Sequence, residues 1–313
     1  MAERPTITDI ESAAVRLSGH VWHTPLVPSR WLSEQTGAEI LLKLENVQVT
    51  GAFKFRGAFN ALSKLRATQP GTKVVVTASA GNHGLAMATA GARLGISVRV
   101  HMPSTAPKAK REALVALGAH LIEAATYDEA EANVREEVAR TGAVFVSAYS
   151  DTDVIAGAGT VALEMLTDDP RLEAFVVPLG GGGLLSGTAI VARARVPKAL
   201  LVGAEADASP VFTGALAAGR PVTVPVSDTV ADGLAGNMEP DSQTFEIVRD
   251  LVDHVVRVPE PLIVQAMRDL MREERLIVEG AGAAAVGALL AGLVPVAVRR
   301  VGVILSGRNV DLK

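Results

Sequence analysis

Short apolar runs recur along this chain, separated by glycine, proline or polar residues. They are mostly β-branched and continuous rather than alternating, at residues 41–45, 73–79, 97–103, 143–149, 174–180, 199–205, 254–258 and 299–307. A continuous apolar run is typical of a strand that is covered on both faces, as in a parallel sheet. We therefore expect these runs to form the strands of buried, mostly parallel sheets.

Helical patterns fill segments between the runs, at residues 82–94, 106–117, 128–140, 153–166, 184–194 and 261–275. This alternation predicts the α/β class with doubly wound sheets. Residues 71–150 read as a complete β-α-β-α-β-α-β unit of their own. We predict two doubly wound domains, in which a small domain of residues 71–150 is inserted in a large domain of residues 1–70 and 151–313.

One uncharged stretch, from Gly280 to Val298, is long enough to raise the question of a membrane span. It consists largely of glycine and alanine, and Pro295 interrupts it. We expect a buried helix near 281–291, then a turn and a strand. The first residues show no basic-then-apolar leader pattern, so we expect a cytoplasmic protein without membrane contact.

The amino-acid composition excludes several classes of protein and of catalytic site. Apolar residues make up 49% of the 313 residues, which excludes a disordered chain. The net charge of −4 argues against a nucleic-acid partner, which requires excess cations. The chain has no cysteine, so thiol nucleophiles, disulfides and iron–sulfur clusters are excluded.

The most informative loop is Pro178-Leu179-Gly180-Gly181-Gly182-Gly183-Leu184-Leu185-Ser186-Gly187, which lies between a predicted strand and a predicted helix. Four successive glycines let backbone N–H groups crowd around an anion at the positive end of the helix, and a phosphate is the natural ligand. The loop also partly matches the glycine-rich motif of dinucleotide-binding proteins, because Glu205 follows it by about twenty residues.

Three further loops carry candidate chemistry. In residues 77–84, Ser79, Asn82 and the backbone N–H groups from 80 to 83 can hold a carboxylate, although Ser79 or Asn82 can also simply cap the helix. In residues 49–58, Lys54 lies between two phenylalanines, and partial burial there would lower its pKa for Schiff-base chemistry. In residues 305–309, Ser306 follows the last strand.

Together these four loops, in this order and spacing, resemble the fold-type II pyridoxal-phosphate enzymes of the threonine dehydratase and serine racemase group. The resemblance extends from residues 23–26 to residues 309–312. It implies that pyridoxal 5'-phosphate (PLP) binds in the cleft between the domains. The implied cofactor contacts are Phe53, Lys54, Asn82, Gly180, Gly181, Gly182, Gly183, Leu184 and Ser306.

The resemblance also implies individual roles. Lys54 forms the Schiff base with the cofactor and removes the Cα proton of the substrate, so it is the catalytic residue. Residues 180–184 cradle the phosphate, Asn82 meets the 3-hydroxyl of the ring, and Ser306 faces the pyridine nitrogen, which favours elimination. The implied contacts of the substrate carboxylate are Ser79, Ala80, Gly81, Asn82 and His83.

Several positions depart from the family pattern. Ala80 stands where serine racemases carry a serine that acts on the opposite face of Cα, which favours dehydration over racemisation. Arg308 replaces a glycine, and it either approaches the cofactor or substrate pocket or points outward. Val211 replaces the aspartate that accompanies Glu205 in relatives with a divalent cation. A weaker or monovalent cation site near Glu205 is therefore possible, but we assign no metal.

The predicted function is that of a PLP-dependent threonine/serine dehydratase, which eliminates water from a β-hydroxy amino acid and releases a 2-oxo acid and ammonia. The alternatives are a serine racemase or a hydroxyaspartate or phenylserine dehydratase on the same scaffold, and an NAD-dependent oxidoreductase from a different class. The sequence leaves the preferred amino acid open, and Arg308, Tyr149 and residues 231–238 are the positions expected to decide it. We expect a homodimer of the short type, without a regulatory module.

Overall fold

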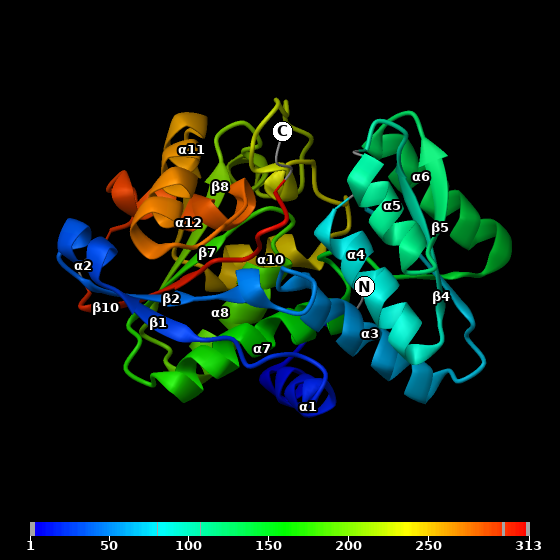
Figure 1. The fold of residues 1–313 in the computed structure, drawn as a ribbon, viewed down its shortest axis with the longest axis horizontal. Helices are drawn as coiled ribbons and strands as arrows, with labels where there is room; N and C mark the ends of the chain where they lie inside the picture. Colours follow the sequence, from blue (N-terminus) through cyan, green and yellow to red (C-terminus); the bar gives the residue numbers. More distant parts are fainter. Residues whose placement is uncertain (1–3, 80, 107, 296–297, 311–313) are drawn as a thin grey trace.

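The computed structural model describes residues 4–79, 81–106, 108–295 and 298–310. The backbone forms two sheets that lie side by side (Figure 1). The larger sheet has six strands in the order β1-β2-β10-β7-β8-β9. Their bounds are Leu26–Ser29 (β1), Glu39–Lys43 (β2), Ala174–Pro178 (β7), Leu200–Ala206 (β8), His254–Val258 (β9) and Arg300–Ile304 (β10).

The smaller sheet has four strands in the order β5-β4-β3-β6. Their bounds are Val74–Ala78 (β3), Ser97–Pro103 (β4), His120–Ala124 (β5) and Val144–Phe145 (β6). These strands are consecutive in the chain and interrupt the strands of the larger sheet. Apart from β1, which pairs antiparallel with β2, the strand pairs of the described residues are parallel. The predicted fold class is confirmed, whereas the boundaries at 71 and 150 stay a prediction.

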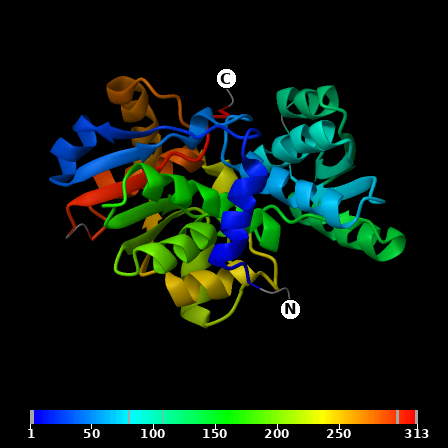
Figure 2. The same ribbon diagram turned by 90° about the horizontal axis from the view of Figure 1, so that it is seen from below.

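Helices cover both faces of the larger sheet. One face packs against α2 (Arg30–Thr36), α11 (Glu260–Asp269) and α12 (Gly280–Leu290). The other face packs against α7 (Thr152–Asp168), α8 (Gly183–Arg195), α9 (Val211–Ala218) and α10 (Gln243–Leu251). Figure 2 shows α1 (Ile7–Leu17, blue) lying over this second layer, where it contacts α7 and α8.

The smaller sheet is covered in the same way. One face packs against α3 (Lys54–Thr68), α4 (Asn82–Leu94) and α5 (Lys108–Ala116), and the other against α6 (Tyr127–Thr141). Short helical turns complete the chain at η1 (Glu45–Val47), η2 (Asp232–Leu234) and η3 (Leu270–Glu274). Because α3 contacts both α4 and α7, it joins the two halves of the molecule.

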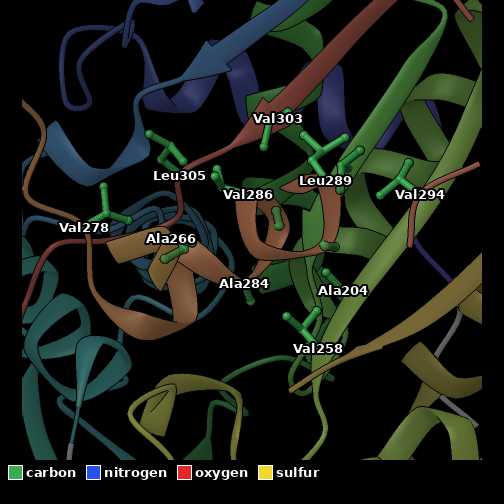
Figure 3. Packing of buried hydrophobic residues seen from close by; sticks show 14 of the residues in the cluster. Ala204, Val258, Ala266, Val278, Ala284, Val286, Leu289, Val294, Val303 and Leu305 are labelled. Atoms are coloured by element: carbon green, nitrogen blue, oxygen red, sulfur yellow. The ribbon is translucent and has the colours of Figure 1, made fainter. Parts of the chain in front are cut away.

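Successive strand residues point to opposite faces, and both faces are apolar. Leu42 belongs to the core under α12, whereas its neighbour Leu41 belongs to the core under α7 and α8. This is why the predicted strands read as continuous apolar runs. Figure 3 shows Ala284 and Leu289 of α12 within the first of these cores, which also contains Ala204 of β8. The glycine- and alanine-rich stretch therefore forms a buried helix, as predicted.

The structure contains several elements outside the predicted segments, among them α1, α2, α9 and α10, and it differs from the prediction at β1 and α3. Strand β1 was not predicted, because it is only four residues long and contains Pro28, which is tolerated at this edge of the sheet. Residues 49–58 were interpreted as a loop, but α3 begins at Lys54. Among the described residues, no helix combines the length and apolar character that a membrane span requires.

Candidate functional site

A cavity of about 420 Å³ lies where β3, β7 and β10 end and α3, α4 and α8 begin. Ligand sites of open α/β sheets are found at such strand ends. The cavity brings together nearly all the predicted site residues: Phe53, Lys54, Ser79, Gly81, Asn82, His83, Gly180, Gly181, Gly182, Gly183, Leu184 and Ser306. Ala80, the remaining predicted residue, lies outside the described residues.

Lys54 is the first residue of α3, and its amine is directed into the cavity. Its Nζ donates a hydrogen bond to the carbonyl oxygen of Ala148 at 2.9 Å and lies 5.1 Å from the centre of the Phe53 ring. Burial lowers the pKa of Lys54 to about 8, although the nearby Glu279 carboxylate opposes this shift. The amine can therefore become a neutral nucleophile at a mildly alkaline pH.

Backbone pairing between distant segments ties Ser306 to Phe53, the residue before Lys54. The N–H of Phe53 donates to the carbonyl of Ser306 at 3.0 Å, and Ala52 and Gly307 form an antiparallel bridge. The segment that precedes α3 is thus paired with the segment that follows β10. Ser306 itself is buried.

The four glycines form the turn between β7 and α8. Gly182 has φ +87°, a conformation that side chains disfavour, and a Cβ there would lie 2.6 Å from the Phe212 ring. A Cβ on Gly181 would lie 2.8 Å from Cδ2 of Tyr149, so the ring of Tyr149 packs directly on this loop. The first N–H groups of α8 have no acceptor within the helix, and they make this turn suitable for an anion.

Ser79 acts as a helix cap in this structure. Its Oγ accepts hydrogen bonds from the N–H of Gly81 at 3.2 Å and from the N–H of Gly84 at 3.0 Å. This is the capping alternative that the sequence allowed, and it orders the turn at the start of α4. The hydroxyl proton of Ser79 is not used by these two bonds, so capping and carboxylate binding are compatible.

Asn82 and His83 follow in the first turn of α4. The side chain of Asn82 donates to Glu279 Oε1 and accepts from Asn309 Nδ2, each at 2.7 Å. His83 is buried at the cavity wall, and burial together with the Lys54 charge lowers its pKa to about 3. The imidazole is therefore neutral and can donate or accept, but it supplies no positive charge.

Other cavity residues lie outside the predicted set. Tyr149 and residues 232–237 line it, in agreement with the specificity role suggested for them from the sequence. Lys110 of α5 and Glu279 at the start of α12 were missed. Lys110 pairs with Asp232 at 3.0 Å across the two halves of the molecule. The sequence feature that could have identified Glu279 is its position as a lone carboxylate directly before a glycine- and alanine-rich helix.

Arg308 and Glu205 lie outside the cavity lining. The Arg308 side chain is exposed, which favours the outward-pointing alternative. Glu205 Oε2 accepts from the N–H of Phe212 at 2.9 Å, and Oε1 accepts from the N–H of Thr213 at 3.1 Å. The carboxylate thus caps α9, which leaves it poorly placed for a cofactor ribose. No group of three or more His, Cys, Asp or Glu suited to a metal occurs among the described residues.

Comparison with known proteins identifies the family. The chain matches the family described as "Pyridoxal-phosphate dependent enzyme" over residues 17–307. An L-threonine ammonia-lyase of Thermotoga maritima is 41% identical over 309 residues, which cover 98% of this chain and 76% of that protein. An L-threo-3-hydroxyaspartate ammonia-lyase of Saccharomyces cerevisiae is 37% identical, with 99% and 94% covered. The structure of maize serine racemase superposes with a TM-score of 0.93 at 35% identity, with 99% and 95% covered.

The chain therefore belongs to the pyridoxal-phosphate dependent enzyme family, and the resemblance stated from the sequence is confirmed. The cavity fits this cofactor. Its volume of about 420 Å³ falls within the roughly 300–1,000 Å³ that is usual for ligands of this size. It also combines a buried amine with an anion-binding helix start, which are the two groups that an aldehyde with a phosphate requires. The NAD-dependent alternative is not supported.

Proposed function

We propose that this PLP-dependent enzyme is an ammonia-lyase that removes water from threonine or serine and releases a 2-oxo acid and ammonia. The observation that carries the proposal is the Lys54 amine, which is buried in a cavity opposite a four-glycine helix start. The relatives named above support the substrate class, because two of the three are ammonia-lyases of amino acids. Both of those substrates carry a β-hydroxyl group.

The site residues have separate tasks in this proposal. The glycine loop and the start of α8 bind the cofactor phosphate, and Lys54 holds the cofactor covalently. When bound, the cofactor supplies an electron sink for negative charge at the substrate Cα. Asn82 would hold the ring hydroxyl of the cofactor, and Phe53 would pack beside the cofactor ring. Ser306 would offer its hydroxyl, which is a weak proton donor, to the ring nitrogen.

Lys54 moves the proton. Its neutral amine would be a base that can take the proton from Cα of the bound substrate. A pKa of about 8 keeps a useful fraction of the amine neutral near physiological pH, whereas an ordinary lysine would be almost entirely protonated. The carbonyl of Ala148, 2.9 Å away, gives the released amine a fixed hydrogen-bond acceptor.

The substrate carboxylate binds at the start of α4. The N–H groups of the first turn and the Ser79 hydroxyl are donors there, and the neutral His83 adds a polar wall without a competing charge. This placement turns Cα toward Lys54. Ala80 belongs to the same proposed site by its position in the sequence.

A substrate panel tests the proposal. Threonine, serine, both diastereomers of 3-hydroxyaspartate and phenylserine are incubated with the holoenzyme, and release of 2-oxo acid is measured. We expect the highest kcat/KM with threonine or serine. Lys54→Ala should lose activity, and borohydride should fix the cofactor to wild-type Lys54 only. Wild-type turnover by Lys54→Ala would refute the proposal.

Serine racemisation is the second candidate, favoured by the similarity to maize serine racemase. Ala80 argues against it, because the sequence resemblance implies that racemases carry a serine at this position as the second acid, and an alanine has no hydroxyl. Chiral analysis of serine after incubation distinguishes the two reactions. We expect little D-serine from the wild type and more from Ala80→Ser.

We also propose that the protein acts as a cytoplasmic homodimer. This assignment rests on the similarity to short enzymes of the same group. Light scattering of the purified holoenzyme tests the dimer, and a monomeric mass with full activity would refute it. Fractionation of the source cells tests the compartment.

A further inference from the structure

Glu279 is a buried carboxylate that the reaction outlined above does not use. It precedes the first residue of α12, only 4% of its surface is exposed, and it lines the cavity. The N–H of Asn309 donates to its Oε2 at 2.9 Å, and the Asn82 side chain donates to its Oε1 at 2.7 Å. The Asn309 side chain completes a closed ring by donating to Asn82 Oδ1 at 2.7 Å.

This ring has a fixed direction because two backbone groups define it. The backbone N–H of Asn309 can only donate, so Glu279 must accept from it. The carbonyl of Thr50 can only accept, and it takes a hydrogen bond from Asn309 Nδ2 at 2.9 Å. The amide nitrogen of Asn309 therefore faces Asn82, whose oxygen must turn toward Asn309 and whose nitrogen must turn toward Glu279.

An ionised carboxylate suits both donors best, because it has two acceptor oxygens and no proton of its own. A glutamine at position 279 would place its own NH₂ group against either Asn82 or the N–H of Asn309. The space for the carboxyl group is also specific, because a Cβ on Gly307 would lie 2.9 Å from Glu279 Cδ. A glycine beside Ser306 is thus needed for Glu279 to reach the ring.

We propose that Glu279 is a positioning residue that fixes the Asn82 amide. The carboxylate holds one N–H of this amide, and the other N–H is offered to the 3-hydroxyl of the bound cofactor. The hydrogen-bonded ring of Glu279, Asn82 and Asn309 joins the start of α4, the start of α12, the segment after β10 and the loop before α3. It therefore sets the relative positions of three of the four loops that form the site. The inference rests on the proposed contact between Asn82 and the cofactor.

The protonation of Glu279 makes the proposed contact depend on pH. Burial raises the pKa of Glu279 to about 7, and repulsion from Asp232 adds to this, while the hydrogen bonds from Asn82 and Asn309 oppose it. The charged groups that face it are Lys54 from α3, Lys110 from α5 and Asp232 from η2. Below this pH the carboxyl group becomes protonated, and its protonated oxygen is a weaker acceptor for its donor.

The experiment compares holoenzymes of the wild type, Glu279→Gln, Asn82→Ala and the double variant. The visible absorption of the bound cofactor is recorded from about pH 6 to about pH 8, around the pKa of Glu279, together with kcat and KM for threonine. We expect Glu279→Gln to shift the band, to lose the transition near neutral pH and to lower kcat about tenfold, as expected for one hydrogen bond. The double variant should be no worse than Asn82→Ala, because both changes act through one contact.

Glu137→Gln is the matched control. Glu137 is also buried and binds His101 at 2.8 Å, but it belongs to α6 and lies outside the cavity lining. It should lower the melting temperature without moving the cofactor band. If Glu279→Gln does not fold, Glu279→Asp takes its place, since it keeps the charge but shortens the reach.

An unchanged cofactor band and pH profile in Glu279→Gln would overturn the inference. A double variant whose fold-loss in kcat equals the product of the two single losses would also overturn it, because the two residues would then act independently. Failure of the proposed function looks different. If the wild type released no 2-oxo acid from the panel while the band still responded to Glu279→Gln, the lyase assignment would fail and the positioning role would stand.

Discussion

Glu239 provides a stability prediction with a definite sign. Its carboxyl group accepts a hydrogen bond from Ser147 Oγ at 2.6 Å, and its backbone N–H donates to the Tyr149 hydroxyl at 2.8 Å. It thereby links the loop before α10 to the segment that leaves the smaller sheet. Burial raises the pKa of Glu239 from its ordinary value of 4.5 to about 7, and Glu131 and Asp241 add repulsion.

The size of the stability change follows from the linkage between protonation of Glu239 and folding. The folded protein holds the Glu239 proton up to about pH 7, whereas the unfolded chain releases it near pH 4.5. Stability is therefore unaffected by this group below the lower pKa and falls as the pH rises through the interval. Since one pKa unit corresponds to about 1.4 kcal/mol, the loss above neutral pH amounts to at most about 3 kcal/mol.

Glu239→Gln removes this titration while keeping the shape of the side chain. Urea unfolding of both proteins at about pH 5 and about pH 8, on either side of the interval, should show that the variant gains stability relative to wild type at the higher pH, by up to about 3 kcal/mol. Glu34→Gln, a change at an exposed carboxylate, should have little effect at either pH. A difference between Glu239→Gln and wild type that stays constant with pH would refute the reasoning.

Three further outcomes are expected. Gly181→Ala should release cofactor during dialysis, because its Cβ would lie 2.8 Å from Cδ2 of Tyr149; unchanged retention would contradict this. Arg56→Met should destabilise the protein by about 3–5 kcal/mol in urea, since it leaves the buried carboxylate of Glu45 unpaired; a neutral effect would contradict this. The rate at which the apoenzyme binds PLP through Lys54 should rise through about pH 8, where the amine becomes neutral; a midpoint near 10 would contradict this.

The strands and the fold class could be predicted because each face of the sheets is covered, which leaves a direct trace in the sequence. The run at 73–79 contains β3, and the run at 299–307 contains β10. Elements with weak patterns could not be predicted in this way. The edge strand β1 is short and contains Pro28, and the first turn of α3 was concealed by the glycines and aromatic residues around Lys54.

The site was predictable where it consists of loops at strand ends. Within the larger sheet, parallel strands bring Gly180 and Ser306 to one edge, and Ser79 at the end of β3 in the smaller sheet lines the same cavity. Glu279 and Lys110 depend instead on how α12 and α5 pack against neighbouring elements. A lone carboxylate before a glycine- and alanine-rich helix marks Glu279 only weakly and no local pattern marks Lys110, so tertiary structure was needed to place both in the site.

The fixed distance between Lys54 and the glycine loop has its own cause in the packing of three helices. A Cβ on Gly157 of α7 would lie 2.7 Å from the Cα of Gly57 of α3, and a Cβ on Gly187 of α8 would lie 2.7 Å from the Cα of Gly159. Helices α3 and α8 thus both cross α7 with their backbones in contact, which glycine alone permits. Because Lys54 begins α3 and the glycine loop leads into α8, the two close contacts with α7 link the amine to the phosphate site through packed backbone.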